Sequence, residues 1–227
     1  MVPEILVIMI ALTYSYCLGS VPTAYLVGRW VRGIDLRQYG SGNIGGSNLA
    51  AHVGKAYFIP VFGFDLFMKG VTTVLIARTL DFGEILQGLI GITAVIGHSW
   101  PFYTRFIGGR GVSTATGVLL ILAPLESLVC SGFASIMTIL FKKSALWVGI
   151  SMILVPTLGL LSGMSREVIY ISIVLIITLT LKRLEANHAK RPPGVSWKHL
   201  FIRRFIFDRD VSATEEWTKR TPKLQDD

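Results

Sequence analysis

Residues 5–28 read ILVIMIALTYSYCLGSVPTAYLVG, and none of these 24 residues is charged. The hydrocarbon core of a bilayer is about 30 Å thick and an α-helix rises about 1.5 Å per residue, so about 20 apolar residues cross it. Residues 85–104 and 144–165 also lack charge, and residues 168–181 reach spanning length if the charged side chains at both ends extend to the interfaces. We therefore expect membrane-spanning helices in these four segments.

The other apolar segments are interrupted by charge or by proline. Residues 56–77 are apolar except for Asp65 and Lys69, which lie four apart and so share one face of a helix. Residues 111–141 are too long for one helix and are predicted to divide into two short helices at Pro124. Taken together, the pattern predicts an all-α, polytopic membrane helix bundle of about seven spans.

The composition favours a membrane protein over a soluble or disordered one. Hydrophobic residues make up 52% of the 227 residues and charged residues 16%, with a mean hydropathy of +0.58. A typical soluble domain is about 25% charged, and disordered chains have few apolar residues. The first apolar segment has no basic residues before it and is longer than the hydrophobic region of a signal peptide, about 7–15 residues, so we expect it to be retained. Cys17 and Cys130 have neither disulfide nor metal-site spacing.

The basic residues predict the orientation in the membrane. With the N-terminus outside, the internal loops hold four, two and two basic residues, and eleven more follow Leu181. Only Arg78 and Arg166 fall outside, so the positive-inside rule favours an N-out, C-in topology. We attribute the net charge of +8 to this topology and to anionic lipid, not to nucleic acid. Residues 1–190 then form the transmembrane domain and residues 191–227 a basic cytoplasmic tail.

Two glycine-rich segments lie on the cytoplasmic side in this topology. They are residues 40–48, GSGNIGGSN, and residues 108–111, GGRG. Glycine lets successive N–H groups point into one concavity that suits an anion, and the second segment precedes an apolar run, at an expected helix N-terminus. For either segment alone an ordinary turn is favoured, because Gly, Asn and Ser are common in loops. For the two segments together, turns and a phosphate site stay open as equal interpretations.

Other polar residues near these segments have two interpretations each. His98 could donate to a phosphate or relay a proton, but its spacing alone favours a histidine that anchors a helix end at the interface. Asp65 and Lys69 could hold substrate, although a structural ion pair is favoured on physical grounds. Asn187 could be a ligand donor or a helix-end residue. The sequence holds no catalytic-triad, nucleophile-elbow or metal-binding motif, so catalysis would depend on positioning and on binding an anion.

Taken together, these segments resemble the bacterial acyl-phosphate-dependent glycerol-3-phosphate acyltransferases, which are integral membrane enzymes of phospholipid synthesis. The matching segments occur in the family's order and at its spacing, roughly within residues 15–120, and as a set they are highly specific. They are GSVPTAY (19–25), GIDLR (33–37), GSGNIGGSN (40–48), FDLFMKG (64–70), HSWP (98–101) and GGRGVST (108–114). Through the last spans the match is mainly one of hydropathy.

The resemblance implies seven spans and an active site that faces the cytoplasm from the bacterial inner membrane. An acyl phosphate would give its acyl group to the 1-hydroxyl of glycerol 3-phosphate, yielding lysophosphatidic acid and phosphate, with no metal, cofactor, coenzyme A or acyl carrier protein. We expect a monomer. By position, the catalytic residues would be Ser41, Asn43 and His98. The residues assigned to phosphate or substrate binding are Arg37, Gly42, Gly45, Gly46, Ser47, Asn48, Asp65, Lys69, Gly108, Gly109, Arg110, Gly111 and Asn187.

Three positions depart from the family's pattern. Ala51 stands where the family usually has an arginine, Arg110 where it has a lysine, and Leu184 where a histidine precedes Asn187 by three. The family residues are thought to handle glycerol phosphate, and the loss at Ala51 removes a charge-assisted contact of about 1.5–3 kcal/mol, for which His52 could compensate weakly. A different phosphorylated or polar acceptor therefore stays open as an alternative. A non-catalytic lipid-binding or transport protein is a further alternative, although no paired repeat is visible.

The tail contains residues 197–207, WKHLFIRRFIF, which mix bulky apolar and basic side chains. At 100° per residue they show no clean apolar face. We expect this segment to lie at the anionic membrane surface. The alternative is a short segment that folds against the cytoplasmic loops.

Overall fold

The structure, a computed structural model, describes residues 3–188, 191–210 and 221, and these residues form helices and loops without a β-strand. The α-helices are α1 (Glu4–Gly19), α2 (Thr23–Arg32), α3 (Gly46–His52), α4 (Phe58–Gly63), α5 (Thr72–Thr79), α6 (Glu84–Ser99), α7 (Val112–Leu122), α8 (Pro124–Phe141), α9 (Ser144–Ser162), α10 (Arg166–Glu185) and α11 (Trp197–Phe207). A π-helix, Phe64–Val71, joins α4 to α5, and short 3-10 turns cover Leu36–Gln38, Lys55–Tyr57, Phe102–Thr104 and Ala186–His188. The predicted all-α bundle is confirmed.

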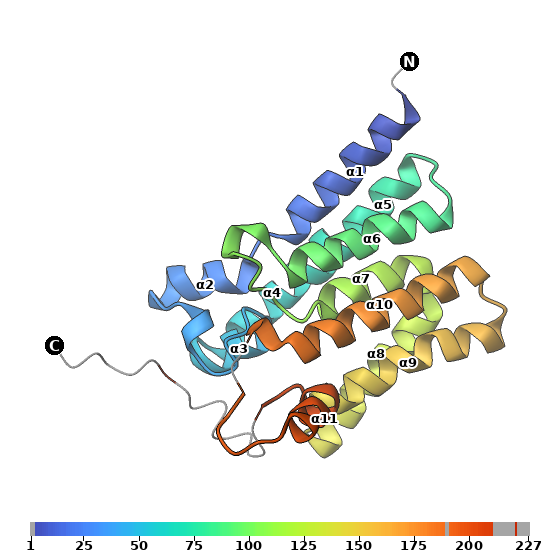
Figure 1. The fold of residues 1–227 in the computed structure, drawn as a ribbon. Helices are drawn as coiled ribbons and strands as arrows, with labels where there is room; N and C mark the ends of the chain where they lie inside the picture. The colour runs from blue at the N-terminus through green and yellow to red at the C-terminus, as the bar shows by residue number, and fades with distance from the viewer. Residues whose placement is uncertain (1–2, 189–190, 211–220, 222–227) are drawn as a thin grey trace.

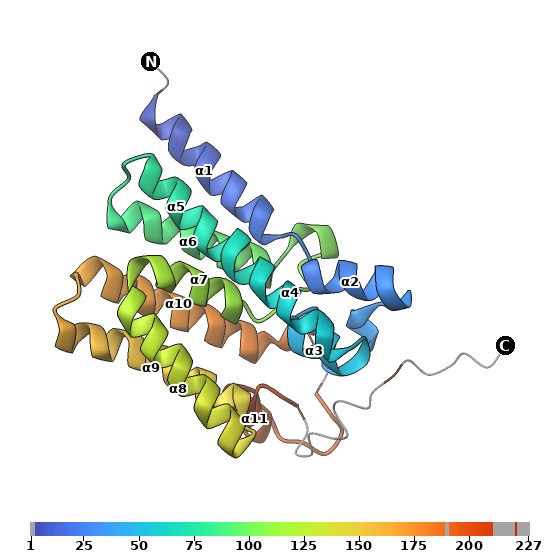
Figure 2. The ribbon, with the colours of Figure 1, turned by 180° about the vertical axis from the view of Figure 1, so that it is seen from behind.

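The long helices run side by side in a slanted bundle (Figure 1). α6 packs against α1 on one side and against α7 and α10 on the other, while α8 and α9 form a hairpin at the far edge. Seen from behind, α4, the π-helix and α5 form one continuous rod that contacts α1 and α7 (Figure 2). The core of the bundle lies where α5, α6, α7 and α10 meet, around the fully buried side chains of Val74, Val95, Val118 and Leu175.

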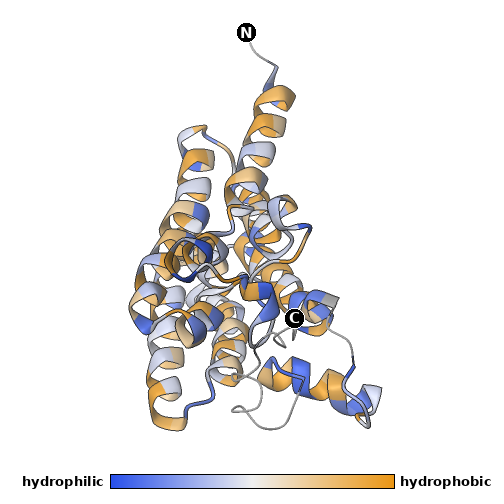
Figure 3. Cartoon of the chain, turned by 90° about the vertical axis from the view of Figure 1, so that its left-hand side faces the viewer, coloured by the Kyte–Doolittle hydropathy of each residue, from blue (hydrophilic) through white to orange (hydrophobic). Residues whose placement is uncertain are grey.

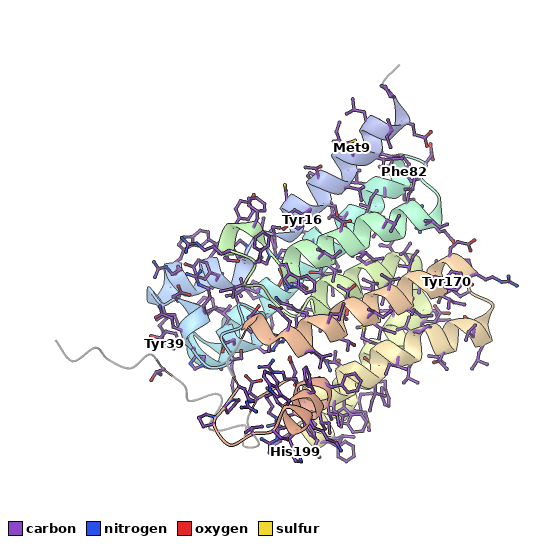
Figure 4. The ribbon with its side chains drawn as sticks, in the orientation of Figure 1. Met9, Tyr16, Tyr39, Phe82, Tyr170 and His199 are labelled. Atoms are coloured by element: carbon purple, nitrogen blue, oxygen red, sulfur yellow. The ribbon has the colours of Figure 1, made fainter. Side chains whose placement is uncertain are left out.

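The connections between helices fall at the two ends of the bundle. Tyr39 and His199 lie at one end, and Met9, Phe82 and Tyr170 lie at the opposite end (Figure 4). Both glycine-rich loops, the α8–α9 connection and α11 share the end marked by Tyr39 (Figure 1). The loops predicted to be cytoplasmic, which are rich in basic residues, therefore gather at one end. The direction of that end in the membrane stays a prediction.

The first predicted span is divided. α1 ends at Gly19 and α2 begins at Thr23, so the prediction of one uninterrupted helix over residues 5–28 is wrong. Pro22 has no N–H to donate and disfavours helical geometry at Val21 before it. The hydropathy pattern does not reveal this break, because residues 20–22 between the two helices are uncharged. α2 turns away from α1 towards the end of the bundle that holds the glycine-rich loops (Figure 1).

The helix predicted over residues 56–77 forms, but its middle is the π-helix instead of a regular α-helix. π-helical turns are rare and occur frequently at functional sites. Here the π-helix packs closely on α7, because a Cβ at Gly70 would overlap the carbonyl oxygen of Thr114. In the same way, a Cβ at Gly117 would overlap the carbonyl oxygen of Leu66. The two glycines therefore allow the two backbones to approach each other.

The segment of residues 111–141 divides at Pro124, as predicted. α7 ends at Leu122, and Pro124 is the first residue of α8, where its missing N–H has no helical partner to lose. The helices predicted over residues 85–104, 144–165 and 168–181 all form as α6, α9 and α10, with ends that differ by a few residues.

Among the described residues, five helical stretches are long and apolar enough to cross a membrane, namely Glu4–Arg32, Lys55–Thr79, Glu84–Thr104, Pro124–Phe141 and Ser144–Ser162. α7 is a shorter apolar helix, and α10 has charged residues at both ends. Large apolar side chains such as Ile139, Leu160 and Leu161 are exposed, and hydrophobic colour covers much of the bundle (Figure 3). Such surfaces fit lipid and not water. The number of spans, predicted as seven, stays a prediction.

The helix of the tail, α11, packs against α9 and α10. Leu200 and Arg204 of this helix are buried, whereas Trp197, Phe201 and Phe205 are exposed at four-residue spacing. The helix therefore has an aromatic row that the sequence pattern did not separate from its basic residues. This packing agrees with the alternative of a segment folded against the rest of the chain, and its contact with the membrane surface stays a prediction.

We predict that Gly117→Val destabilises the full chain by about 1–3 kcal/mol, because the added methyl groups force α7 away from the π-helix. The measurement is the midpoint of thermal unfolding in detergent. Gly132→Val on α8 is the matched control, since Gly132 is exposed and a Cβ there meets nothing within 4 Å. Equal midpoints for the two variants would contradict the close packing described here.

Candidate active site

The ammonium group of Lys69 lies at the centre of a buried polar cluster. The side chain is 1% exposed and belongs to the π-helix. Its Nζ donates to the carbonyl oxygen of Val21 at 2.6 Å and lies 2.7 Å from Asp65 Oδ1 and 3.3 Å from His98 Nδ1. An ammonium group has three N–H donors, so each donor has an acceptor.

Asp65 and His98 complete the cluster. Asp65 forms the ion pair with Lys69 that their spacing predicted, and its Oδ1 also accepts a hydrogen bond from Thr23 Oγ1 at 3.1 Å. His98 is buried at the end of α6, with Nδ1 3.7 Å from Asp65 Oδ1, so the interpretation as an interfacial anchor is wrong. If the Lys69 ammonium donates to Nδ1, the ring hydrogen of His98 lies on Nε2.

The first glycine-rich loop is organised from within by Asn48. The side-chain amide of Asn48 donates to the carbonyl oxygens of Leu36 at 3.1 Å, Tyr39 at 3.0 Å and Asn43 at 2.9 Å. Gly40 has a φ of +53°, and a Cβ at this position would overlap Asn48 Oδ1, so glycine is required here. Asn48 was assigned to phosphate by position, but these contacts give it the role of a support for the loop.

Arg37, just before this loop, is held by its neighbour Asp35. The guanidinium lies 2.5 Å from Asp35 Oδ2, and its Cζ is 5.2 Å from the centre of the Tyr25 ring. The hydrogen bond from the Arg37 side chain lowers the pKa of Asp35 below its usual value, against the opposing effect of partial burial. Asp35 also accepts a hydrogen bond from the Arg37 backbone N–H and so caps the following turn.

Asn187 clamps the second glycine-rich loop from the end of α10. Asn187 Oδ1 accepts from the N–H of Gly108 at 3.2 Å, and Nδ2 donates to the carbonyl oxygen of Gly108 at 3.1 Å. The N–H of Gly109 donates to the carbonyl oxygen of His98, and a Cβ at Gly109 would overlap His98 Nε2. Gly111, with a φ of +78°, directly precedes α7, so the predicted helix N-terminus is confirmed.

The side chain of Arg110 reaches α10 and the tail. Its Nε lies 2.8 Å from Asp208 Oδ1, and its Nη1 donates to the carbonyl oxygen of Lys182 at 3.0 Å. Lys182 is fully buried, pairs with Glu185 at 2.8 Å and lies 4.8 Å from the centre of the Trp100 ring. The prediction that the Lys182 side chain extends to the membrane interface is therefore wrong. Sequence reasoning missed Lys182, Glu185 and Asp208, because no motif connects them to the second loop.

The two loops converge on a cavity of about 710 Å³. The predicted site residues that line this cavity are Asn43, Gly45, Gly46, Ser47, Asp65, His98, Arg110 and Gly111. A neighbouring hollow of about 340 Å³ is lined by the other predicted residues Arg37, Ser41, Gly42 and Asn187. Asn48, Lys69, Gly108 and Gly109 line neither hollow. The sequence therefore identified two loops that the fold does bring together.

The cavity favours an anion. Its described lining includes two acidic side chains, Asp65 and Asp208, and each is paired with a cation. Asn43 Oδ1 is buried and accepts no hydrogen bond from the described residues, so a ligand hydroxyl or amide can donate to it. The described residues contain no group of three His, Cys, Asp or Glu side chains that could hold a metal ion. The basic side chains of the lining are Arg110, Lys142, Lys143, Arg183 and Arg209.

Comparisons with known proteins agree with the resemblance described above. Residues 9–191 match the family described as glycerol-3-phosphate acyltransferase. The chain is 37% identical over 221 residues to glycerol-3-phosphate acyltransferase 5 of Dehalococcoides mccartyi (strain ATCC BAA-2266 / KCTC 15142 / 195), covering 95% of this chain and 94% of that protein. It is 38% identical over 174 residues to the glycerol-3-phosphate acyltransferase of Parasynechococcus marenigrum, covering 77% of this chain and 82% of that protein.

Solved structures show the same fold. The crystal structure of PlsY, an integral membrane glycerol 3-phosphate acyltransferase, in its glycerol 3-phosphate form matches with a TM-score of 0.73 and 28% identity. The lysophosphatidic acid form of PlsY matches with a TM-score of 0.70 and 26% identity. Both matches cover 79% of this chain and 89% of the PlsY chain.

We predict that Lys69→Met costs about 3–5 kcal/mol of stability, because Asp65 is left as a buried carboxylate without its cation. The measurement is thermal unfolding of the full chain in detergent. The double variant Asp65→Asn with Lys69→Met should unfold much closer to the wild type, since both charges are then removed. A double variant as unstable as Lys69→Met alone would contradict the ion-pair interpretation.

Proposed function

The chain belongs to the glycerol-3-phosphate acyltransferase family, and we propose that it transfers an acyl group from an acyl phosphate to the 1-hydroxyl of glycerol 3-phosphate. The observation that carries this proposal is the convergence of the two glycine-rich loops on one cavity with basic walls. Both proposed substrates carry a phosphate group, which suits backbone N–H donors and cationic side chains. The proposed products are lysophosphatidic acid and inorganic phosphate.

The proposed reaction makes few chemical demands on the protein. The acceptor oxygen attacks the acyl carbon, an ester bond forms, and the bond between that carbon and the phosphate oxygen breaks. The hydroxyl proton passes to an oxygen of the phosphate, so no protein base is needed. Because phosphate is a good leaving group, catalysis depends on orienting the two substrates and on stabilising negative charge.

We assign the acyl phosphate to the first loop. Asn43, Gly45 and Gly46 line the cavity, where the side-chain amide Nδ2 of Asn43 and backbone N–H groups can donate to phosphate oxygens. Ser41 lies on the other side of the loop, where its Oγ accepts from the Asn43 N–H at 3.2 Å and so holds Asn43 in place. His98, whose Nε2 carries the hydrogen in the inferred tautomer, supplies a further donor near the reacting groups.

We assign the phosphate of the acceptor to Arg110 and to the N-terminus of α7, where the helix dipole adds to the positive charge. Ala51, on α3, and Leu184 carry no positive charge, so neither supplies the cation that the resemblance leads us to expect at its position. Arg183 lines the same cavity, however, and keeps it basic. This arrangement supports glycerol 3-phosphate as the acceptor over an uncharged alternative.

We further propose that the protein is a monomer of the bacterial cytoplasmic membrane whose active site faces the cytoplasm. The support for this orientation is the gathering of basic loops at the end of the bundle that holds the cavity. The helix α11 lies at that same end (Figure 1).

We predict that the purified full chain in lipid nanodiscs releases phosphate from palmitoyl phosphate only when glycerol 3-phosphate is present, with lysophosphatidic acid formed in equal amount. The measurement is phosphate release together with mass spectrometry of the lipid product. No product with any acceptor would overturn the enzyme assignment, and faster transfer to another polar acceptor would favour the alternative substrate. Solute flux in proteoliposomes without acyl transfer would favour a transporter.

We predict that Ser41→Ala and Asn43→Ala each lower kcat by about 10²-fold, as expected when a preorganised donor or its support is lost. Ser162→Ala is the matched control, because Ser162 ends α9 at the opposite end of the bundle. Its activity should equal that of the wild type. Full activity in Asn43→Ala, with unfolding unchanged, would contradict the assignment of the first loop.

A further inference from the structure

Residues 207–209 contribute to the cavity wall, although they lie outside residues 9–191, which match the family model. Phe207, the last residue of α11, lines the same cavity as Asn43 and His98, and so do the next two residues, Asp208 and Arg209. The match to the family model does not extend to these residues, and we infer their role from their contacts.

Asp208 directly contacts the guanidinium of Arg110. The two carboxylate oxygens lie 2.8 Å and 2.9 Å from Arg110 Nε, and the side chains are 18% and 12% exposed, respectively. Arg110 Nη1 is held separately by the carbonyl oxygen of Lys182 at 3.0 Å. Two of the three guanidinium nitrogens thus have fixed partners, and within the described residues nothing holds Nη2.

Asp208 is itself held in place by the fold of the tail. It ends α11 in the left-handed conformation, with a φ of +53°, and its N–H donates to the carbonyl oxygen of Arg204 at 3.0 Å. Arg204 is buried, lies 2.6 Å from Asp210 Oδ1 and donates to the carbonyl oxygen of Leu184 at 2.9 Å. The carboxylate of Asp208 is therefore presented by a segment that is attached to α10.

We propose that Asp208 is a positioning residue for Arg110, which orients the guanidinium so that Nη2 binds the phosphate of the acceptor. The inference rests on the proposed function, in which Arg110 is the cation that binds the phosphate of glycerol 3-phosphate. An arginine side chain has many rotamers, and holding it in advance at two nitrogens removes that entropic cost from substrate binding. The tail is then part of the active site and not only a membrane-surface segment.

The test is the affinity of the full chain in detergent for glycerol 3-phosphate, measured by calorimetry, together with KM and kcat. Asp208→Asn keeps the shape and removes the charge, so we expect about tenfold weaker binding and a similar rise in KM for glycerol 3-phosphate. The KM for palmitoyl phosphate and kcat should change little. Asp81→Asn is the matched control, because Asp81 is exposed, shares the left-handed φ and lies at the opposite end of the bundle.

Two further variants separate positioning from a structural role. Asp208→Glu keeps the carboxylate and should restore most of the affinity, whereas a purely structural defect would persist and would lower the unfolding midpoint. In an Arg110→Ala background, Asp208→Asn should cause no further loss, because the group that it positions is gone. An equal loss in that background would overturn the proposal.

Unchanged or tighter binding of glycerol 3-phosphate by folded Asp208→Asn would also overturn the proposal, and tighter binding would mean that the carboxylate competes with the substrate for Arg110. Failure of the proposed function has a different signature. In that case the wild type forms no lysophosphatidic acid while it still binds glycerol 3-phosphate, and the calorimetric comparison of the variants still decides the role of Asp208. A wild type without measurable binding would overturn both proposals.

Discussion

The buried ammonium group of Lys69 joins three parts of the chain that are far apart in sequence. Its acceptors come from the break after α1, from the π-helix and from the end of α6. Taking a charge out of water costs several kcal/mol unless protein groups replace its hydration. Here three protein acceptors replace that hydration. Because they bind one ammonium group, they hold the break after α1 and the end of α6 against the rod formed by α4, the π-helix and α5.

The two glycine-rich loops depend on this cluster and on two asparagines. The backbone and ring of His98 support Gly109, and Asn187 clamps Gly108 from α10. Asn48 holds the first loop by three backbone contacts. Several side chains that a motif search assigns to the ligand therefore serve the loop, and the groups left for an anion are backbone N–H groups, Asn43 and the cations. This preorganisation is what the proposed acyl transfer requires.

Much of this arrangement could be predicted from the sequence. The lengths of the apolar segments and the position of Pro124 predicted where most of the long helices lie. Bilayer thickness sets the length of a spanning helix, and proline sets where a helix can begin. The break at Pro22 was missed, since its uncharged neighbours have the hydropathy of a helix. The spacing of Asp65 and Lys69 predicted their ion pair, but the burial of His98 beside it depends on how α6 packs. The contact of Asp208 with the second loop is a long-range one, which local patterns do not encode.

The central claim is that the two loops bind one phosphate-bearing ligand between them. The most direct test is an experimental structure of the full chain in lipid with glycerol 3-phosphate and a non-hydrolysable acyl phosphonate. The account predicts ligand phosphate oxygens within hydrogen-bond distance, about 3.2 Å or less, of donors in both residues 40–48 and residues 108–111. Phosphate density that contacts one loop alone, or that lies outside the cavity, would contradict it.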